Sequence, residues 1–538
     1  MAVLIEDLIK TIELLLRFNK KHSKPRIDPD LDPVLLVPGI AGSILNAKYE
    51  DGREERVWVR VLGADHEFRT KLWSKFDPAT GKTVSMNENT TIVVPQDRYG
   101  LYAIDTLDPD MIIGQEAVFY YHELIVQMIK WGFQEGKTLF GFGYDFRQSN
   151  RLQETLDKLS AKLESVYTLS GGRKINIITH SMGGLLVKCF MSLHSDIFEK
   201  YVKNWIAIAA PFQGAPGYIT AALLNGCSFV DGWEQNFFIS KWSMQQLLIE
   251  CPSIYELMAN PDFSWDCHPL VQVWREIHDD DGSGSSRTLL ESYQLTESLP
   301  LMKEALSGNM VEVDGKQIHL PLNLQILKWA NDTRNILSNA KVPATVNFYN
   351  IYGTHYDTPH SVSYGSEEAP ISDVKELLCA FPRFIYVNGD GTVPVESGKA
   401  DGLDAVARVG VSADHRGIVA DHRVFRILKQ WLKAGEPDPF YDPLNDYVIL
   451  PTAFEVEKYV EQGLQVTTLK EDWEIISPET DDTVNNEPAD NPTTIGGLLV
   501  TVGKEQPYSE AQASVVVHPR SEGAHHVEVR AVGVTASG

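Results

Sequence analysis

Cysteine is scarce in this sequence, with five residues among 538. They are widely spaced and form no C-x-x-C pair, so the sequence predicts neither a zinc site nor a dense disulfide framework. Nucleotide motifs are missing as well: Gly141-Phe-Gly143 is only a fragment of a dinucleotide fingerprint, and no Walker pattern occurs. We therefore expect no metal and no cofactor.

Positive charge is also in short supply. The chain has 48 Lys and Arg residues against 73 Asp and Glu residues, which gives a net charge of −25 at pH 7. A nucleic-acid partner is not expected, because such partners are bound through basic surfaces that neutralise phosphates. Any contact with a membrane surface must rely on apolar insertion or on local basic patches, and not on the net field of the molecule.

Long hydrophobic runs are the third absence, since no stretch of about 18 uncharged apolar residues occurs. The N-terminal segment, residues 1–30, carries Glu6, Asp7 and Glu13 inside its apolar pattern and lacks a small-residue cleavage site, unlike a signal peptide. Its apolar residues recur at three- and four-residue steps, which predicts an amphipathic helix that either docks on the domain or lies on lipid. We expect a cytoplasmic protein that makes peripheral contact with a membrane surface.

One stretch, residues 174–189, has the pattern of a nucleophile elbow: a β-branched apolar run reaches Ser181 and then becomes an amphipathic helix. Residues two before and two after such a serine must tolerate crowding, because the turn is strained. Gly183 and Gly184 meet this need on the far side, whereas Thr179 stands where a glycine is usual. Taken alone, the pattern also fits a serine that caps an ordinary helix.

The surrounding elements alternate between strand and helix. A buried strand near Val34 ends in a glycine-rich turn at Gly39 to Gly42, helices are predicted over 120–131 and 152–167, and a further strand begins at Trp205. This order predicts an α/β fold in which a mainly parallel sheet has helices on both faces. We assign residues 31–214 to the first half of this core.

The remaining segments differ in composition. Residues 47–76 lack clear periodicity and are predicted to form a mobile loop, and residues 215–345, rich in Trp, Met and Leu, are predicted to form an inserted helical cap. Residues 346–455 hold the second half of the core, in which the runs 344–351 and 383–387 are predicted to resume the main sheet. An acidic, Lys- and Arg-poor linker over 456–495 then precedes a small β-rich tail over 496–538.

Two further residues complete a hydrolase pattern with Ser181. Asp390 follows the apolar run 383–387 in a Gly-Asp-Gly turn, and His415 lies in a loop before an amphipathic helix. His422, in the first turn of that helix, is the alternative histidine. Serine, aspartate and histidine in this chain order are typical of α/β-hydrolases.

The residue types match the chemistry of acyl transfer. Ser181 is a weak nucleophile until His415 takes its proton, and Asp390 holds the imidazole in the required tautomer. The backbone N–H groups of Met182 and Ile40 are predicted to bind the developing oxyanion, an interaction that typically lowers the barrier by a few kcal/mol.

Six motifs together make the chain resemble the lecithin:cholesterol acyltransferase family, and more narrowly its plant phospholipase A members, over roughly residues 30 to 450. They are Val-Pro-Gly-Ile-Ala-Gly-Ser (37–43), Tyr-Asp-Phe-Arg (144–147), Thr-His-Ser-Met-Gly-Gly (179–184), Ala-Ala-Pro-Phe-Gln-Gly-Ala-Pro (209–216), Gly-Asp-Gly-Thr-Val-Pro (389–394) and Asp-His-Arg-Gly-Ile (414–418).

This resemblance implies an α/β-hydrolase with a cap and a lid over an acyl-chain channel. It implies Ser181, Asp390 and His415 as the triad, the lid within 47–76, a glycerophospholipid substrate and an acyl-serine intermediate. No metal is implied, so calcium independence is expected. The lid segment has no cysteine, unlike the cysteine-bridged lid of secreted animal members, which agrees with a reducing compartment.

The leading hypothesis from the sequence is a phospholipase A. An acyltransferase, in which a sterol or another alcohol replaces water, shares the first half-reaction and remains open. A non-catalytic lipid-binding or scaffold protein is the hypothesis from another class. The sequence carries no signal of an oligomeric state.

Overall fold

The computed structural model of the chain divides into two units, residues 1–449 and 450–538. Each unit is described by itself. The structure describes residues 27–61, 63–87, 89–111, 114–226, 239–278, 286–313, 316–437, 447–449, 494–501, 510–519 and 525–532.

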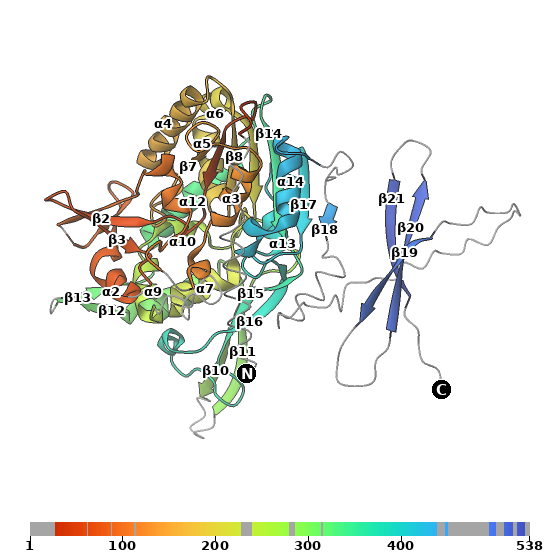
Figure 1. Ribbon diagram of the computed structural model, residues 1–538. Coiled ribbons are helices and arrows are strands. Elements are labelled where there is room, and N and C mark those ends of the chain that lie inside the picture. The colour runs from red at the N-terminus through yellow and green to blue at the C-terminus, as the bar shows by residue number, and fades with distance from the viewer. Residues whose placement is uncertain are drawn as a thin grey trace, which may run out of the picture. The chain divides into compact units, whose positions relative to one another are not determined.

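A seven-stranded sheet forms the centre of the larger unit (Figure 1), and all six strand pairings in it are parallel. Its order is β18-β17-β14-β9-β8-β1-β7. In chain order the strands are β1 (Val34–Val37), β7 (Leu139–Gly141), β8 (Ile175–His180), β9 (Val202–Ile208), β14 (Asn347–Gly353), β17 (Ala407–Val411) and β18 (Tyr447–Ile449).

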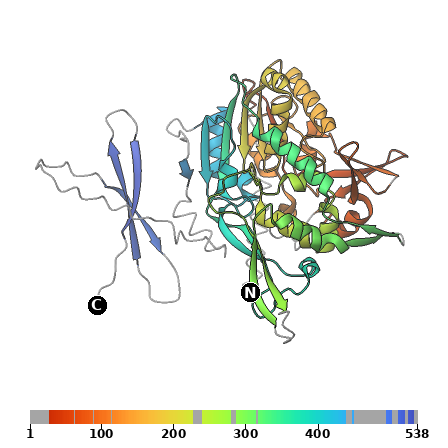
Figure 2. The ribbon, with the colours of Figure 1, turned by 180° about the vertical axis from the view of Figure 1, so that it is seen from behind.

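Both faces of this sheet are covered by helices, as the sequence predicts. Val34 and Leu36 pack with the apolar side chains of α3 (His122–Lys130) and α14 (His422–Leu432). Leu35 and Val37 point to the opposite face and pack with α4 (Gln153–Leu169) and α5 (Gly183–Leu193), because alternate residues of a strand face opposite sides. Two hydrophobic cores therefore enclose the sheet. Figure 2 shows the ribbon of the sheet and its helices from behind.

A long insertion separates β9 from β14. It holds helices, as predicted, and also two β-hairpins that the sequence reading missed. The elements among its described residues are α7 (Pro216–Asn225), α9 (Lys241–Leu248), α10 (Pro252–Glu256), β10 (Val271–His278), β11 (Ser286–Tyr293), α11 (Ser298–Ala305), η5 (Leu306–Gly308), β12 (Met310–Val313), β13 (Lys316–His319) and α12 (Leu324–Ser338).

A second sheet combines this insertion with a later one. The hairpin of β15 (Tyr356–Tyr364) and β16 (Arg383–Gly389) adds to β10 and β11, in the order β11-β10-β15-β16. The run 383–387 belongs to β16, which pairs antiparallel with β15 in this second sheet. The prediction that it resumes the main sheet is therefore wrong. It forms an edge strand of the second sheet, with Asp390 directly after it.

The segment 47–76, predicted as a mobile loop, contains ordered elements instead. Trp58, Leu72 and Trp73 are buried there, because partners far along the chain cover them. The strands are too short for their periodicity to be recognised. The elements are β2 (Leu45–Tyr49), β3 (Glu54–Trp58), α2 (Ala64–Glu67), η1 (Phe68–Leu72) and β4 (Ser74–Asp77), with β5 (Lys82–Ser85) and β6 (Thr90–Val93) following.

Short helical elements connect the rest of the larger unit. They are η2 (Arg98–Gly100), η3 (Tyr102–Ile104), η4 (Gln115–Val118), α6 (Ser195–Tyr201), η6 (Val374–Leu378), α13 (Val395–Lys399) and η7 (Gly417–Ala420). Among the described helices of the chain, none is long and apolar enough to cross a membrane.

The second unit holds a three-stranded antiparallel sheet, as the predicted β-rich tail requires. Its strands are β19 (Thr494–Thr501), β20 (Glu510–Pro519) and β21 (His525–Val532). The predicted N-terminal helix, and nearly all of the predicted linker over 456–495, lie outside the described residues.

Candidate active site

Ser181 lies on a sharp turn between β8 and α5. Its φ of +53° falls in the left-handed region, which a non-glycine residue adopts only when its surroundings hold it there. The Ser181 N–H donates to the carbonyl of Ile208 at 2.9 Å, which fixes the turn to the end of β9. The elbow predicted from the sequence is therefore present, and Ser181 is not an ordinary helix cap.

Small residues permit this turn. A Cβ atom on Gly183 would lie 2.4 Å from the carbonyl oxygen of Pro38, and one on Gly184 would lie 2.6 Å from the Cβ of Ala210. Real Cβ atoms do not approach other atoms so closely, so larger residues would displace α5 from the sheet. The two glycines are thus required by packing on the far side of Ser181.

Thr179 occupies the near side, where the sequence led us to expect crowding. Its side chain is fully buried, and its hydroxyl accepts a hydrogen bond from the indole N–H of Trp205 at 3.1 Å. The neighbouring strand thus gives the extra hydroxyl both space and a partner. This contact explains why a threonine can stand at the usual glycine position.

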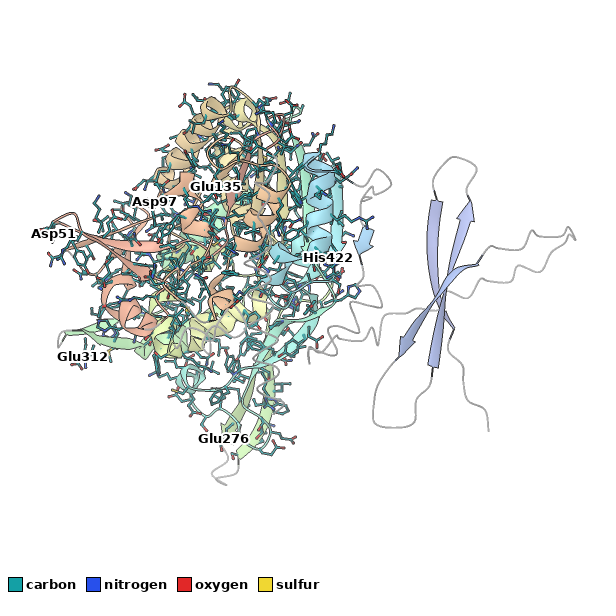
Figure 3. All side chains as sticks on the ribbon, viewed as in Figure 1. Asp51, Asp97, Glu135, Glu276, Glu312 and His422 are labelled. Atoms are coloured by element: carbon teal, nitrogen blue, oxygen red, sulfur yellow. The ribbon has the colours of Figure 1, made fainter. Side chains whose placement is uncertain are left out.

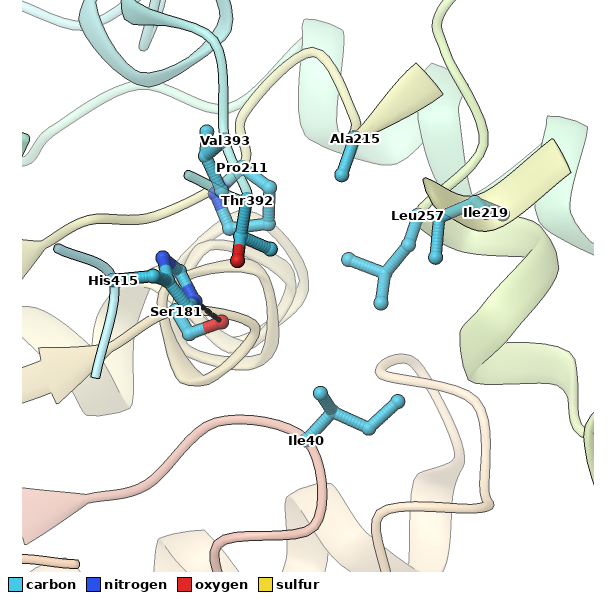
Figure 4. A pocket seen from close by; sticks show the side chains of 9 residues that line it. All are labelled: Ile40, Ser181, Pro211, Ala215, Ile219, Leu257, Thr392, Val393 and His415. Atoms are coloured by element: carbon cyan, nitrogen blue, oxygen red, sulfur yellow. Dashed lines mark hydrogen bonds between the residues drawn. The ribbon is translucent and has the colours of Figure 1, made fainter. Parts of the chain in front are cut away.

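His415 and Asp390 meet Ser181 in the expected arrangement. The Nε2 atom of His415 is 2.9 Å from the Ser181 hydroxyl oxygen, and its Nδ1 atom is 2.7 Å from Oδ2 of Asp390 (Figure 4 for Ser181 and His415). Because a carboxylate only accepts, Nδ1 carries the proton and Nε2 is free to accept from the serine. The other carboxylate oxygen accepts from the N–H groups of Thr392 and Val393, at 2.9 and 2.6 Å.

His422, the alternative histidine, is the first residue of α14. Figure 3 labels it beside that helix, whose N-cap is Asp421. The imidazole that contacts both Ser181 and Asp390 belongs to His415, which is 7% exposed. The geometry therefore favours His415 for the role of base.

The two predicted oxyanion groups flank the serine. Met182 follows Ser181 directly, and Ile40 lines the same pocket as Ser181. Within the described part of the chain, the N–H groups of Ile40 and Met182 donate to no protein acceptor. Both groups are available to a ligand oxygen, as an oxyanion site requires.

The loop that carries Ile40 is pressed against the serine, and this contact makes a prediction. A Cβ atom on Gly39 would lie 2.6 Å from the Cβ and 3.0 Å from the hydroxyl oxygen of Ser181. Gly39→Ala should therefore displace the loop and lower kcat on a short-chain ester about 100-fold, the order expected for a misplacement near 1 Å. Gly308→Ala is the control, because nothing lies within 4 Å of its added Cβ. Equal kcat values for the two variants would contradict the prediction.

The pocket beside Ser181 is narrow and apolar. Its volume is about 20 Å³, roughly the space of one water molecule. Figure 4 shows the side chains that line it, several of which come from the insertion after β9. The lining residues are Ile40, Ser181, Pro211, Ala215, Ile219, Leu257, Thr392, Val393 and His415.

Two residues next to the triad were missed by the sequence reading. The Tyr120 hydroxyl oxygen accepts a hydrogen bond from the Gly39 N–H and forms another with the His180 ring, and that ring contacts the backbone carbonyl of His415. His180 stands beside Ser181 in the sequence, which was a usable signal. Tyr120 gave none, because about 60 residues separate it from the serine.

Potential metal ligands are not grouped in the described residues: no cluster of three or more His, Cys, Asp or Glu side chains there could hold a metal ion.

A parallel sheet with helices on both faces, and a serine on the turn after its interior strand β8, define an α/β-hydrolase fold. The chain belongs to the lecithin:cholesterol acyltransferase family, whose model matches residues 56–400. The resemblance stated from the sequence motifs is thereby confirmed.

Three relatives describe the range of this similarity. Lecithin-cholesterol acyltransferase-like 4 of Arabidopsis thaliana is 61% identical over 538 residues, which cover 99% of each chain. Phospholipase A(1) LCAT3 of the same plant is 50% identical over 407 residues, 75% of this chain and 91% of its own. The lysosomal phospholipase A and acyltransferase of Bos taurus is 25% identical over 389 residues, 68% of this chain and 81% of its own.

Proposed function

We propose that this protein is a serine-dependent phospholipase A that cleaves a fatty acyl ester of phosphatidylcholine or a related glycerophospholipid. The observation that carries the proposal is the hydrogen-bonded series from Ser181 through His415 to Asp390 at the mouth of an apolar pocket. The relative named as a phospholipase A(1), 50% identical to this chain, supports the choice of substrate class.

The first half-reaction forms an acyl-enzyme. The Ser181 oxygen attacks the ester carbonyl carbon while Nε2 of His415 takes the hydroxyl proton, and the N–H groups of Ile40 and Met182 stabilise the oxyanion. When the tetrahedral intermediate collapses, the bond to the glycerol oxygen breaks and His415 returns the proton to that oxygen. The products of this step are a lysolipid and an acyl ester of Ser181.

The second half-reaction returns the free enzyme. Water attacks the acyl-serine carbonyl, His415 takes a proton from the water, and the same proton is returned to the Ser181 oxygen as the fatty acid leaves. Asp390 keeps the imidazole oriented and stabilises its charged form in both steps. Two backbone N–H groups hold Oδ1 of Asp390 in place, and Oδ2 therefore stays directed toward Nδ1 of His415.

An alcohol in place of water would make the same protein an acyltransferase. The bovine relative is named both a phospholipase A and an acyltransferase, so this alternative stays within the same site. We propose hydrolysis as the main outcome, and the product assay below includes a sterol acceptor. A non-catalytic lipid-binding role is the remaining alternative, and labelling of Ser181 by a fluorophosphonate would contradict it.

The test is product analysis on phosphatidylcholine vesicles whose two acyl chains carry different labels. We expect free fatty acid and lysolipid from the wild-type protein, and loss of both products in Ser181→Ala, because without the hydroxyl no acyl-enzyme forms. The label in the fatty acid identifies the acyl position that is cut. A sterol ester as the main product would replace the proposal by the acyltransferase alternative, and turnover by Ser181→Ala would contradict both.

Calcium independence and location are proposed with the function. The reaction above uses protein groups at every step, so activity in the vesicle assay should persist in EDTA; a loss that calcium restores would contradict this. Peripheral contact with a membrane surface follows from the proposed substrate. The cytoplasmic location stays a prediction, which fractionation of cells with an antibody to the protein would test.

A further inference from the structure

A chain of three hydrogen bonds connects residues 39–42, the oxyanion loop that carries Ile40, to His415. The Gly39 N–H donates to the hydroxyl oxygen of Tyr120 at 2.7 Å. That oxygen lies 2.6 Å from Nδ1 of His180, and Nε2 of His180 lies 2.8 Å from the carbonyl oxygen of His415. The chain therefore begins beside Ile40 and ends on His415 itself.

One proton arrangement satisfies all of these atoms. The His415 carbonyl only accepts, so Nε2 of His180 carries a proton and donates to it. In a neutral imidazole Nδ1 is then the acceptor, and the Tyr120 hydroxyl donates to it. The lone pairs left on the Tyr120 oxygen accept from the Gly39 N–H. Each link fixes the polarity of the next.

The surroundings of the two side chains maintain this arrangement. Burial, together with the nearby His415 and Arg416, holds the pKa of His180 well below its usual value, so its ring is neutral at physiological pH. Burial raises the pKa of Tyr120, so its hydroxyl keeps its proton. Both groups therefore stay in the protonation states that the hydrogen bonds require.

Packing holds the tyrosine ring in place as well. A Cβ atom on Gly42 would lie 2.5 Å from two ring carbons of Tyr120, so the ring rests directly on the backbone of the oxyanion loop. The ring of His180 lies 5.0 Å from that of His415, measured between centroids. A shift of the Tyr120 ring would therefore move the oxyanion loop, and a shift of the His180 ring would move the His415 ring.

We propose that Tyr120 and His180 are positioning residues that set the oxyanion N–H of Ile40 and the imidazole of His415 in register with each other. The inference rests on the proposed function and adds a coupling between two parts of the site that the triad alone does not connect. Neither side chain is required to touch the substrate.

The test uses two neighbouring buried tyrosines. Tyr120→Phe removes the central link, whereas Tyr121→Phe, the matched control, removes a hydroxyl that donates to the carbonyl of Val37 at 2.9 Å. On a short-chain ester we expect kcat to fall about 10- to 100-fold in Tyr120→Phe, with KM nearly unchanged; the upper end is the order expected for a misplacement near 1 Å. Tyr121→Phe should keep kcat close to the wild-type value.

A second readout separates positioning from a general loss of structure. A trifluoromethyl ketone adds to the serine and places an oxyanion against the N–H groups, so its inhibition constant reports the geometry of the transition state. The constant should rise in Tyr120→Phe by about the factor by which kcat/KM falls. His180→Asn keeps an acceptor for the Tyr120 hydroxyl, but its side chain is too short to reach the His415 carbonyl. It should show the same fall in kcat and the same rise in the inhibition constant. This variant tests the inference if Tyr120→Phe does not fold.

The outcomes are distinct. Equal kcat and inhibition constants for Tyr120→Phe, His180→Asn and Tyr121→Phe, with wild-type protein active and Ser181→Ala inactive, would overturn the inference and leave the proposed function intact. A fall in kcat without a change in the inhibition constant would also overturn it, because the oxyanion loop would then not have moved. An inactive wild-type protein would overturn the proposed function, and the inference with it.

Discussion

His415→Ala should lower kcat on a soluble ester by about 10⁶-fold, the order seen when the base of a serine triad is removed. The reason is the pair of contacts at 2.9 Å to Ser181 and 2.7 Å to Asp390. Among the residues that the structure describes, no other side chain forms a hydrogen bond with the Ser181 hydroxyl, so without this imidazole none of them is placed to take the serine proton. His422→Ala should leave kcat nearly unchanged, since His422 begins α14 and the ring at the serine is that of His415.

The two alanine variants form a matched pair, because each removes one imidazole from the same short region of the chain. Kinetics with a nitrophenyl ester, beside thermal unfolding of each variant, measure the effect and show that both proteins fold. If His422→Ala were inactive while His415→Ala retained turnover, the assignment of the base would be wrong.

Arg147→Met should cost about 3 to 5 kcal/mol of the free energy of unfolding, the range expected when one partner of a buried ion pair is removed. The Arg147 side chain is 2% exposed, and its guanidinium donates to both oxygens of Asp145, at 2.9 and 2.7 Å. It also donates to the carbonyl of Leu72 at 2.7 Å. The substitution leaves the Asp145 carboxylate and the Leu72 carbonyl without this donor.

The pH dependence of that loss has a definite sign. Burial alone would raise the pKa of Asp145, but the charge of Arg147 and its hydrogen bonds lower it in the wild-type protein. The ionised form of Asp145 therefore stabilises the wild-type fold above its unfolded pKa, and this contribution disappears as the pH falls. Without Arg147, burial is the main influence on Asp145 and raises its pKa. Protonation of Asp145 at acid pH then removes the buried unpaired charge and so reduces the destabilisation of the variant. The difference in unfolding free energy between the two proteins should shrink toward acid pH.

A double-mutant cycle with Asp145→Asn measures the coupling directly. Urea unfolding of the two single variants and of Asp145→Asn/Arg147→Met gives the interaction energy, and the double variant should be less destabilised than the two single effects added together. Strictly additive effects would contradict an interacting pair. A single variant with wild-type stability would contradict the predicted magnitude.

Local sequence was sufficient for the serine and not for the strand before the aspartate. The turn at Ser181 needs small residues directly after the serine, so this need is visible in the sequence as Gly183 and Gly184, even though the atoms they pack against belong to Pro38 and Ala210. The run 383–387 looks like a buried strand of the main sheet, yet β16 is an edge strand of the second sheet. Which sheet a strand joins depends on β15 and β10, and β10 lies more than 100 residues away.

Distance along the chain explains the other error. Trp58 and Trp73 lie in the segment 47–76, which has no clear periodicity and is therefore predicted to be a mobile loop, yet both side chains are buried. Their indole N–H groups donate to the carbonyls of Ala41 and Gln246, which lie 17 and 173 residues away. A segment that is ordered by such contacts cannot be told from a mobile loop by its own composition. Tyr120 was missed for the same reason.

The origin of Asp390 in the second sheet has a consequence for engineering this enzyme family. Ser181 and His415 follow strands of the main sheet, whereas Asp390 follows the edge strand β16, several of whose side chains are exposed. Segments with few buried apolar contacts open more readily than well-packed ones. Substitutions that stabilise the main sheet would then slow global unfolding without extending the time for which the protein stays active. Substitutions that strengthen the pairing of β16 with β15 are the ones expected to lengthen the half-life of activity.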